Sequence, residues 1–163
     1  MPYKIMIVDD EAANLRLLER LFRSDYTVIT SESGAEALKL LEQQDVALLI
    51  TDQRMPGMTG IELVQRTVPL RPHVVRIILT GYTDVESLVE ALNSGHVYKY
   101  VTKPWNNDEL RLTVSRALEH YEANRARHEL EMTNRRLVAR LKKIGELAAL
   151  EEDEQYKFEQ HHA

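Results

Sequence analysis

Five polar residues in the first two thirds of the chain have side chains that together could transfer a phosphoryl group. Each follows a short apolar segment: Asp9, Asp10, Asp52, Thr80 and Lys103. The three carboxylates could supply the oxygen-rich, negative site that a hard cation such as Mg2+ (or Mn2+) needs. With a cation bound, Asp52 could attack phosphorus and form an aspartyl phosphate. The Lys103 ammonium and the Thr80 hydroxyl would then stabilise the oxygens of the phosphoryl group.

Each of these residues has a more common explanation when it is taken alone. An aspartate at the end of a strand usually caps a helix or lies in a solvated turn, and Asp10 could cap a helix that begins at Glu11. Thr80 could be a turn residue, and Lys103 with Pro104 could form a rigid surface loop. The joint occurrence of these residue types after four separate apolar segments nevertheless favours a common site.

The apolar segments that precede these residues are typical of buried strands. Five strands are expected, at 3–10, 26–30, 46–52, 74–81 and 97–102. Several are apolar at successive positions, as strands with both faces covered require. Helical patterns lie between them near 11–23, 34–44, 60–68 and 84–94, and another begins near 107. This alternation predicts an α/β fold of the (βα)5 type, a doubly wound, parallel, five-stranded sheet with helices on both faces.

Four of the expected helix starts carry the spacing of a capping box. A Ser, Thr or Asn is followed three residues later by Glu at Ser33/Glu36, Thr59/Glu62, Thr83/Glu86 and Asn106/Glu109. In such a box the first side chain accepts a hydrogen bond from the backbone N–H three residues later. The coincidence of these pairs with the expected boundaries predicts where the helices begin.

The carboxyl ends of the strands in a parallel sheet lie at one edge, where such folds bind ligands. The residues after the first, third, fourth and fifth strands should therefore converge there. The stretch "DQRMPGMTG" contains Pro56, Gly57 and Gly60, which should turn the chain away and frame the site. Gly81, next to Thr80, should leave room for an incoming phosphoryl donor.

Composition indicates a soluble globular protein and excludes several classes. The 163 residues suit one domain with an appendage, and 44% are hydrophobic and 29% charged. The apolar segments are too short to span a membrane and no signal peptide precedes the first strand, so a cytoplasmic location is expected. The absence of cysteine excludes disulfides and thiolate metal sites. A net charge of -5 gives no reason to expect nucleic acid as the main partner.

The last third of the chain is expected to be one long helix. From Asp108 to about Leu150 it contains no proline and a single glycine, Gly145. Its apolar residues repeat every seven positions as the seam of a coiled coil: Leu130, Asn134, Leu137, Leu141, Ile144 and Ala148. Leucine at d positions with asparagine at one a position favours a two-stranded coil in register. Residues 121–163 are therefore expected to form a helical dimerisation segment, in which the acidic end, 151–163, shows no clear pattern and should fray.

These residues also carry a resemblance to a known family. Residues 1–120 resemble a response-regulator receiver domain of two-component signalling, which implies a flavodoxin-like fold. The family's acidic pair corresponds to Asp9 and Asp10, its phosphoacceptor to Asp52, its hydroxyl residue to Thr80 and its lysine to Lys103. The segments "DQRMPGMTG" and "YVTKPW" agree with the family almost letter for letter.

The resemblance implies roles for further residues. It implies that the Lys103–Pro104 peptide bond is cis and that Tyr100 is an aromatic switch residue that turns inward on phosphorylation. Without the resemblance, Tyr100 would be interpreted as a half-exposed strand aromatic. The backbone carbonyl of Arg54 would ligate Mg2+, and the Arg54 side chain with Tyr82 would tune the rate of autodephosphorylation.

The mechanism that the resemblance implies is a phosphorylation switch. A histidine kinase or phosphotransfer protein would phosphorylate Asp52 with Mg2+ bound and so reshape the surface of the fourth helix, fifth strand and fifth helix. Enzymatic activity would be limited to self-phosphorylation from a donor and autodephosphorylation. The long last helix resembles those of receivers that precede a separate output domain, and 163 residues contain no such domain. Phosphorylation is expected to change the pairing of a parallel homodimer; a passive tether and a stand-alone receiver adaptor are the alternatives.

Two other functions fit parts of the sequence less well. The basic run "RRLVARLKK" at 135–143 could bind nucleic acid, but it overlaps the leucine seam and acidic residues 151–154 follow it. A metal-dependent phosphohydrolase would also form an aspartyl phosphate at Asp52. Related hydrolases usually carry a second aspartate two residues after the nucleophile, and that position is Arg54 here.

Overall fold

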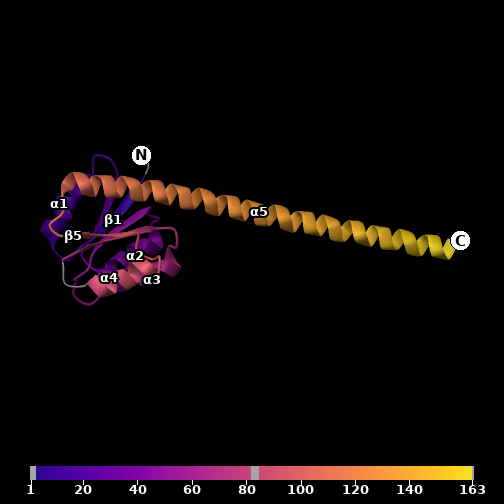
Figure 1. The fold of residues 1–163 in the computed structure, drawn as a ribbon, viewed down its shortest axis with the longest axis horizontal. Coiled ribbons are helices and arrows are strands. Elements are labelled where there is room, and N and C mark those ends of the chain that lie inside the picture. The colour runs from indigo at the N-terminus through magenta and orange to yellow at the C-terminus, as the bar shows by residue number, and fades with distance from the viewer. Residues whose placement is uncertain (1–2, 82–84, 163) are drawn as a thin grey trace. The chain divides into compact units, whose positions relative to one another are not determined.

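Strands and helices alternate along residues 3–81 and 85–162, the part of the chain that the computed structural model describes. The chain divides into two units, Met1–Ala123 and Asn124–Ala163, which are described separately below. Figure 1 labels α1 to α5 and the strands β1 and β5. The first unit contains the sheet and all the residues of the expected phosphoryl-transfer site.

The sheet has five parallel strands in the order β2-β1-β3-β4-β5. The strands are β1 (Lys4–Val8), β2 (Thr27–Ser31), β3 (Leu48–Asp52), β4 (Val75–Thr80) and β5 (Lys99–Thr102). Every residue of β3 and β4 is buried, as expected for inner strands covered on both faces. The predicted (βα)5 fold is thereby confirmed. The strands begin or end at most two residues inside the predicted ranges, and β2 ends one residue beyond its range.

Helices cover both faces of this sheet. They are α1 (Ala12–Phe22), α2 (Gly34–Gln43), α3 (Gly60–Leu70), α4 (Val85–Asn93) and α5 (Asn107–His162). Successive side chains of a strand point to opposite faces, so Ile5 and Ile7 pack with α1 and the beginning of α5. Met6 and Val8 pack with α2 and α3 on the other face, where α4 also lies (Figure 1). This layering leaves the strand ends at one edge for the site.

Side-chain caps form at three of the four predicted helix starts. The side-chain oxygens of Ser33, Thr59 and Asn106 accept hydrogen bonds from the backbone N–H three residues later, at 3.1, 3.2 and 3.1 Å. Each cap satisfies one of the backbone donors that a helix leaves unpaired in its first turn. The fourth cap falls on Thr83, which lies outside the described residues.

Helix α3 ends two residues later than predicted because its C-terminus is held by a buried arginine. Pro69 lies in the last turn, where its missing N–H removes a single helical bond. Arg76 is 5% exposed and donates to the carbonyl oxygen of Arg71 at 2.9 Å and to the Thr67 hydroxyl at 2.7 Å. Burial lowers the pKa of Arg76 to about 10, so the side chain remains a cation at neutral pH. This arginine carries no signal in the local sequence and was not predicted.

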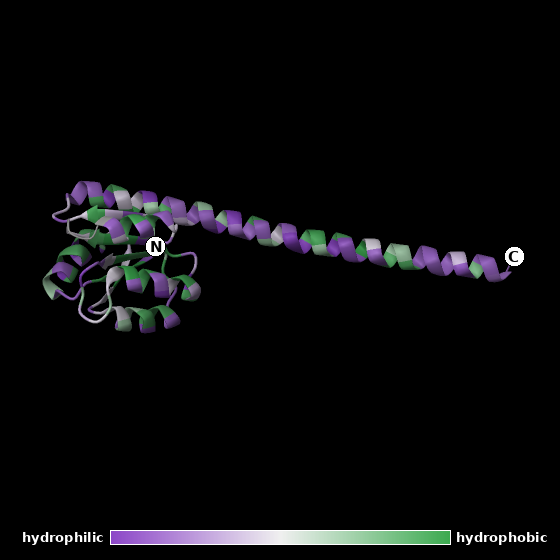
Figure 2. Ribbon diagram, turned by 60° about the horizontal axis from the view of Figure 1, so that its bottom comes forward, coloured by the Kyte–Doolittle hydropathy of each residue, from purple (hydrophilic) through white to green (hydrophobic). Residues whose placement is uncertain are grey.

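The second unit is helical to His162, whereas the sequence analysis expected its acidic end to fray. Pairs four residues apart support the last turns, because residues i and i+4 are neighbours on a helix. Lys157 lies 2.9 Å from Asp153, and the rings of Phe158 and His162 stack with centroids 4.0 Å apart. Hydrophobic bands alternate with hydrophilic ones along this helix (Figure 2).

The predicted seam positions lie on the exposed surface of this helix. The leucines Leu130, Leu137 and Leu141 are 66%, 48% and 68% exposed, and Ile144 is 60% exposed. So much apolar surface on one helix is typical of a helix that pairs with another. In the described residues, 3–81 and 85–162, no helix has the length and apolar character needed to cross a membrane.

Candidate functional site

Three carboxylates meet at the carboxyl edge of the sheet. Strand β1 lies beside β3, with Val8 opposite Thr51, so the residues that follow Val8 and the last residue of β3 are neighbours. One carboxylate oxygen from each of Asp9, Asp10 and Asp52 lies within 4.8 Å of the other two. Clustered carboxylates repel one another unless a cation neutralises them, and oxygen ligands suit Mg2+. The three side chains therefore have the chemistry and the spacing that a hard divalent cation needs.

Asp9 is the most buried of the three and is held by two donors. Its oxygens accept hydrogen bonds from the Glu11 N–H at 2.9 Å and from the Asn14 side-chain amide at 3.2 Å. Burial raises the pKa of Asp9 above the usual value for aspartate, and the charge of Asp52 adds to the rise. The Glu11 N–H and the Lys103 ammonium oppose this rise. A bound cation would favour the ionised form of Asp9, as the clustered carboxylates require.

Helix α1 is not capped by Asp10, an alternative that the sequence left open. The cap position of this helix is Glu11, which makes no side-chain capping bond. Asp10 is exposed and its carboxylate faces the cluster with Asp9 and Asp52, so it does not cap α1. Asn14 was not identified from the sequence, because one amide on an amphipathic helix carries no signal of its own.

Lys103 reaches the same cluster from the other side. Its ammonium lies 2.6 Å from a carboxylate oxygen of Asp52, although β4 separates β5 from β3 in the sheet. The backbone N–H of Lys103 donates to the carbonyl oxygen of Thr80 at 2.8 Å, which ties the end of β5 to the end of β4. The Lys103–Pro104 peptide bond is cis. The lysine side chain is 29% exposed, so the ion pair borders solvent.

Thr80 lies at the end of β4 on the same edge and is 3% exposed. Its hydroxyl donates to the carbonyl oxygen of Gly81 at 2.9 Å, so its hydrogen bond is local in this structure. A methyl group added at Gly81 would meet no atom within 4 Å. The space around the Gly81 Cα is therefore open, and the approach of a phosphoryl donor through it stays a prediction.

The loop after Asp52 is anchored by residues that the sequence analysis did not identify. Gln53 is 7% exposed, and its side-chain oxygen accepts a hydrogen bond from the Ile61 N–H at 2.9 Å. The Gly60 N–H donates to the Gln53 carbonyl oxygen at 3.0 Å. The Thr51 hydroxyl donates to the carbonyl oxygen of Asp52 at 2.9 Å. These bonds close the loop on itself and fix the backbone that carries the Asp52 carboxylate.

Replacing Gly60 with alanine is expected to destabilise the first unit by about 1–3 kcal/mol. A Cβ at this position would collide with the carbonyl oxygen of Asp52, which is backbone and cannot turn aside. Chemical denaturation followed by circular dichroism would measure the change. Gly81→Ala is the matched control, because it adds the same methyl group in open space. Equal stability of Gly60→Ala and Gly81→Ala would contradict the close approach.

The remaining predicted residues lie near the cluster or outside the described part of the chain. Arg54 is exposed in the loop two residues after Asp52. Tyr82 lies outside the described residues. Tyr100 is half-buried on β5, opposite Ile78 of β4, and packs against the apolar cluster between the sheet, α3 and α4.

Comparisons with known proteins agree with this site and fold. The model of the response regulator receiver domain family matches residues 5–115. The hydrogenase transcriptional regulatory protein HoxA of Cupriavidus necator is 37% identical over 128 residues, which are 78% of this chain and 27% of HoxA. The DNA-binding transcriptional regulator NtrC of Escherichia coli is 35% identical over 119 residues, 72% of this chain and 25% of NtrC. The chain thus spans about a quarter of the length of these curated relatives.

Solved structures show the same relationship. A structure of adenylate cyclase from Rhodopirellula baltica superposes with a TM-score of 0.78 and 32% identity, covering 80% of this chain and 97% of that one. The signal receiver domain of an HD domain-containing protein from Pseudomonas fluorescens gives a TM-score of 0.72 and 35% identity. The match covers 77% of this chain and 93% of that one. With the family match over residues 5–115, the flavodoxin-like sheet and these relatives, the chain belongs to the response regulator receiver domain family of two-component signalling.

Proposed function

We propose that this receiver accepts a phosphoryl group on Asp52 from the phosphohistidine of a histidine kinase or phosphotransfer protein. The observation that carries this proposal is the 2.6 Å contact between the Lys103 ammonium and Asp52, made beside two further carboxylates. Asp52 is buried, and its ion pair with Lys103 uses one carboxylate oxygen, so the other oxygen would attack the phosphoryl donor. Asp9, Asp10, Asp52 and the Arg54 carbonyl would hold Mg2+ or Mn2+.

The chemistry is an in-line displacement at phosphorus. An oxygen of the Asp52 carboxylate forms a bond to phosphorus while the bond from phosphorus to the histidine nitrogen breaks. The electron pair of that bond remains on the imidazole, and Asp52 becomes an acyl phosphate. Lys103 stays close to the transferred oxygens, where its charge is worth most during the transfer. Bound Mg2+ would neutralise the oxygens of the phosphoryl group.

The phosphoryl donor would approach beside Lys103. A cavity of about 470 Å3 lies there, lined by Asn14, Leu17, Lys103, Pro104, Trp105 and Asn107. Leu17 is 51% exposed and lines this cavity. A protein donor could cover Leu17 while its phosphohistidine enters next to Asp52.

Phosphorylation would act as a switch through Thr80 and Tyr100. The Thr80 hydroxyl has only a local bond to the Gly81 carbonyl, so it can exchange that bond for one to a phosphoryl oxygen on Asp52. Movement of Thr80 would free space for the half-buried Tyr100 to turn inward. Arg54 and Tyr82 would tune the hydrolysis of the acyl phosphate, which is the receiver's own enzymatic activity.

The switch would be transmitted by residues 121–163 acting as a dimerisation segment. The exposed seam of Leu130, Leu137, Leu141 and Ile144 would pair with the same seam of a second copy, and Asn134 would select a two-stranded register. In a longer protein this coil would lead into an output domain.

Intact mass spectrometry after incubation with acetyl phosphate and Mg2+ tests the proposal. The wild-type protein is expected to gain one phosphoryl group, and peptide mapping after reduction of the acyl phosphate with borohydride should locate it at Asp52. Adding EDTA should suppress the gain, because the three carboxylates would then lack their cation. Failure to gain mass, or a phosphoryl group on another residue, would overturn the proposal.

A further inference from the structure

A side chain of α1, Asn14, holds one of the carboxylates of the proposed cation site. Its amide nitrogen donates to Oδ2 of Asp9 at 3.2 Å and to Oε2 of Glu11 at 3.3 Å. The backbone N–H of Glu11 donates to the other oxygen of Asp9, Oδ1, at 2.9 Å. Both carboxylate oxygens of Asp9 therefore have a donor, one from a side chain and one from the backbone.

The contacts of Asn14 fix the direction in which its amide group faces. The amide nitrogen lies beside two carboxylates, and the reverse orientation would set the amide oxygen against both of them. The backbone of Asn14 is fixed as well, because Leu15 and Leu18 of the same helix are buried in the core against the sheet. Asn14 thus offers Asp9 a hydrogen-bond donor from a rigid element.

Asp9 needs donors from the protein because like charges lie beside it. One carboxylate oxygen from each of Asp10 and Asp52 lies within 4.8 Å of an oxygen of Asp9, and such charges repel one another. Asp9 is 1% exposed, so water can do little to offset this repulsion before a cation binds. Each carboxylate oxygen has two lone pairs, so a single donor on each oxygen still leaves a lone pair for a cation.

We propose that Asn14 is a positioning residue that sets the affinity of this site for a divalent cation. It holds the Asp9 carboxylate beside Asp10 and Asp52 before the cation binds, so that the repulsion among the three carboxylates does not turn Asp9 away. Carboxylates that ligate metals are themselves hydrogen-bonded, and loss of such a partner weakens metal affinity about 10- to 100-fold. This inference rests on the cation site of the proposed function and adds the residue that prepares that site.

This role separates the binding of the cation from the transfer of the phosphoryl group. The two bonds of the Asn14 amide are made to Asp9 and Glu11, whereas the ion pair at the phosphoacceptor joins Asp52 and Lys103. Loss of the amide should therefore raise the Mg2+ concentration at which phosphorylation is half-maximal and leave the rate at saturating Mg2+ near that of the wild-type protein. A residue that acted on the transfer itself would lower the saturating rate.

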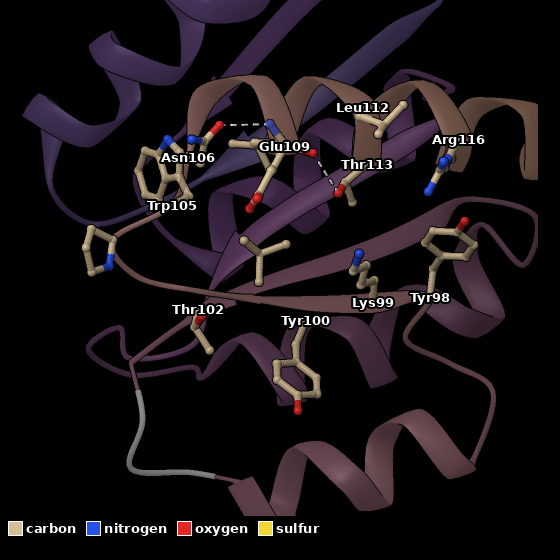
Figure 3. Close-up of a pocket in the computed structure, with 13 residues that line it drawn as sticks. Tyr98, Lys99, Tyr100, Thr102, Trp105, Asn106, Glu109, Leu112, Thr113 and Arg116 are labelled. Atoms are coloured by element: carbon tan, nitrogen blue, oxygen red, sulfur yellow. Dashed lines mark hydrogen bonds between the residues drawn. The ribbon is translucent and has the colours of Figure 1, made fainter.

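Titration of the full chain with Mg2+ in a calorimeter, at fixed pH, tests the proposal. The dissociation constant of Asn14→Ala should be about tenfold higher than that of the wild-type protein. Alanine is a good helix former, so α1 should be retained. Asn14→Leu, which keeps the shape of the side chain without the donor, should show the same rise. The fluorescence of Trp105, the chain's only tryptophan, provides a second titration, because this residue lies just before α5 (Figure 3) and lines the same cavity as Asn14.

The matched control is Asn93→Ala, which makes the same change at an exposed position at the end of α4. This control should bind Mg2+ as the wild-type protein does. Equal dissociation constants for Asn14→Ala and Asn93→Ala would overturn the proposal, and so would a lower rate of phosphorylation of Asn14→Ala at saturating Mg2+. A wild-type protein that binds no Mg2+ would overturn the cation site itself and this inference with it, so the two failures are distinguishable.

Discussion

Replacing Asp52 with asparagine is expected to abolish phosphorylation by acetyl phosphate, a loss of at least about 10³-fold in rate. An amide has no anionic oxygen to attack phosphorus, and it also removes the charge that holds Lys103 at 2.6 Å. The time course of the phosphorylated species in intact mass spectra, at fixed Mg2+, measures the rate. Circular dichroism of the variant would verify that the sheet and helices are retained.

Asp45→Asn is the matched control for this loss, because it makes the same chemical change at an exposed aspartate in the segment before β3. It should be phosphorylated at the wild-type rate. Phosphorylation of Asp52→Asn at a rate near that of Asp45→Asn would refute Asp52 as the acceptor. Equal losses in both variants would refute it as well, since the effect would then follow net charge.

Replacing Leu141 with lysine is expected to dissociate the proposed homodimer, with a dissociation constant raised by at least about 100-fold. Leu141 is 68% exposed on its own helix and occupies the central a position of the seam, so a dimer would bury both copies of it. In the dimer, lysine at this position would place two ammonium groups, one from each copy, in the apolar seam. Sedimentation equilibrium over a range of concentrations measures the change.

Ala139→Lys is the matched control for the coil. It adds the same charge two residues earlier, at an f position on the side of the helix opposite the seam. This variant should dimerise as the wild-type protein does. A wild-type protein that sediments as a monomer at every concentration would rule out the dimer, and equal dissociation by both lysines would rule out the seam.

Local sequence signals predicted most of the fold correctly, because each has a short-range physical cause. Ser33, Thr59 and Asn106 cap their helices because a side-chain oxygen can reach the backbone N–H three residues later without help from the rest of the chain. The apolar runs predicted inner strands since both faces of a parallel sheet are covered. Because β1 and β3 are parallel neighbours, Asp9 and Asp52 lie at the same edge of the sheet.

Other features could not be predicted because they depend on contacts between distant residues. Nothing in the local sequence indicates that Gly60 must lie against the carbonyl oxygen of Asp52 or that Gln53 must bond to the Ile61 N–H. The buried Arg76 is similar, since its acceptors on Thr67 of α3 and on Arg71, directly after that helix, become available only when α3 packs on β4. The helical continuation to His162 depends on side-chain pairs that the seven-residue pattern does not include.

The sequence by itself determined the alternation of strands and helices and the residue types at each strand end, because period and capping are properties of neighbouring residues. The tertiary structure alone decided how these residues meet. It placed the Lys103 ammonium beside Asp52 across an intervening strand, and it directed the Lys99 and Tyr100 side chains to opposite faces of β5. Such distances follow from sheet order and from packing between layers, which no short segment encodes.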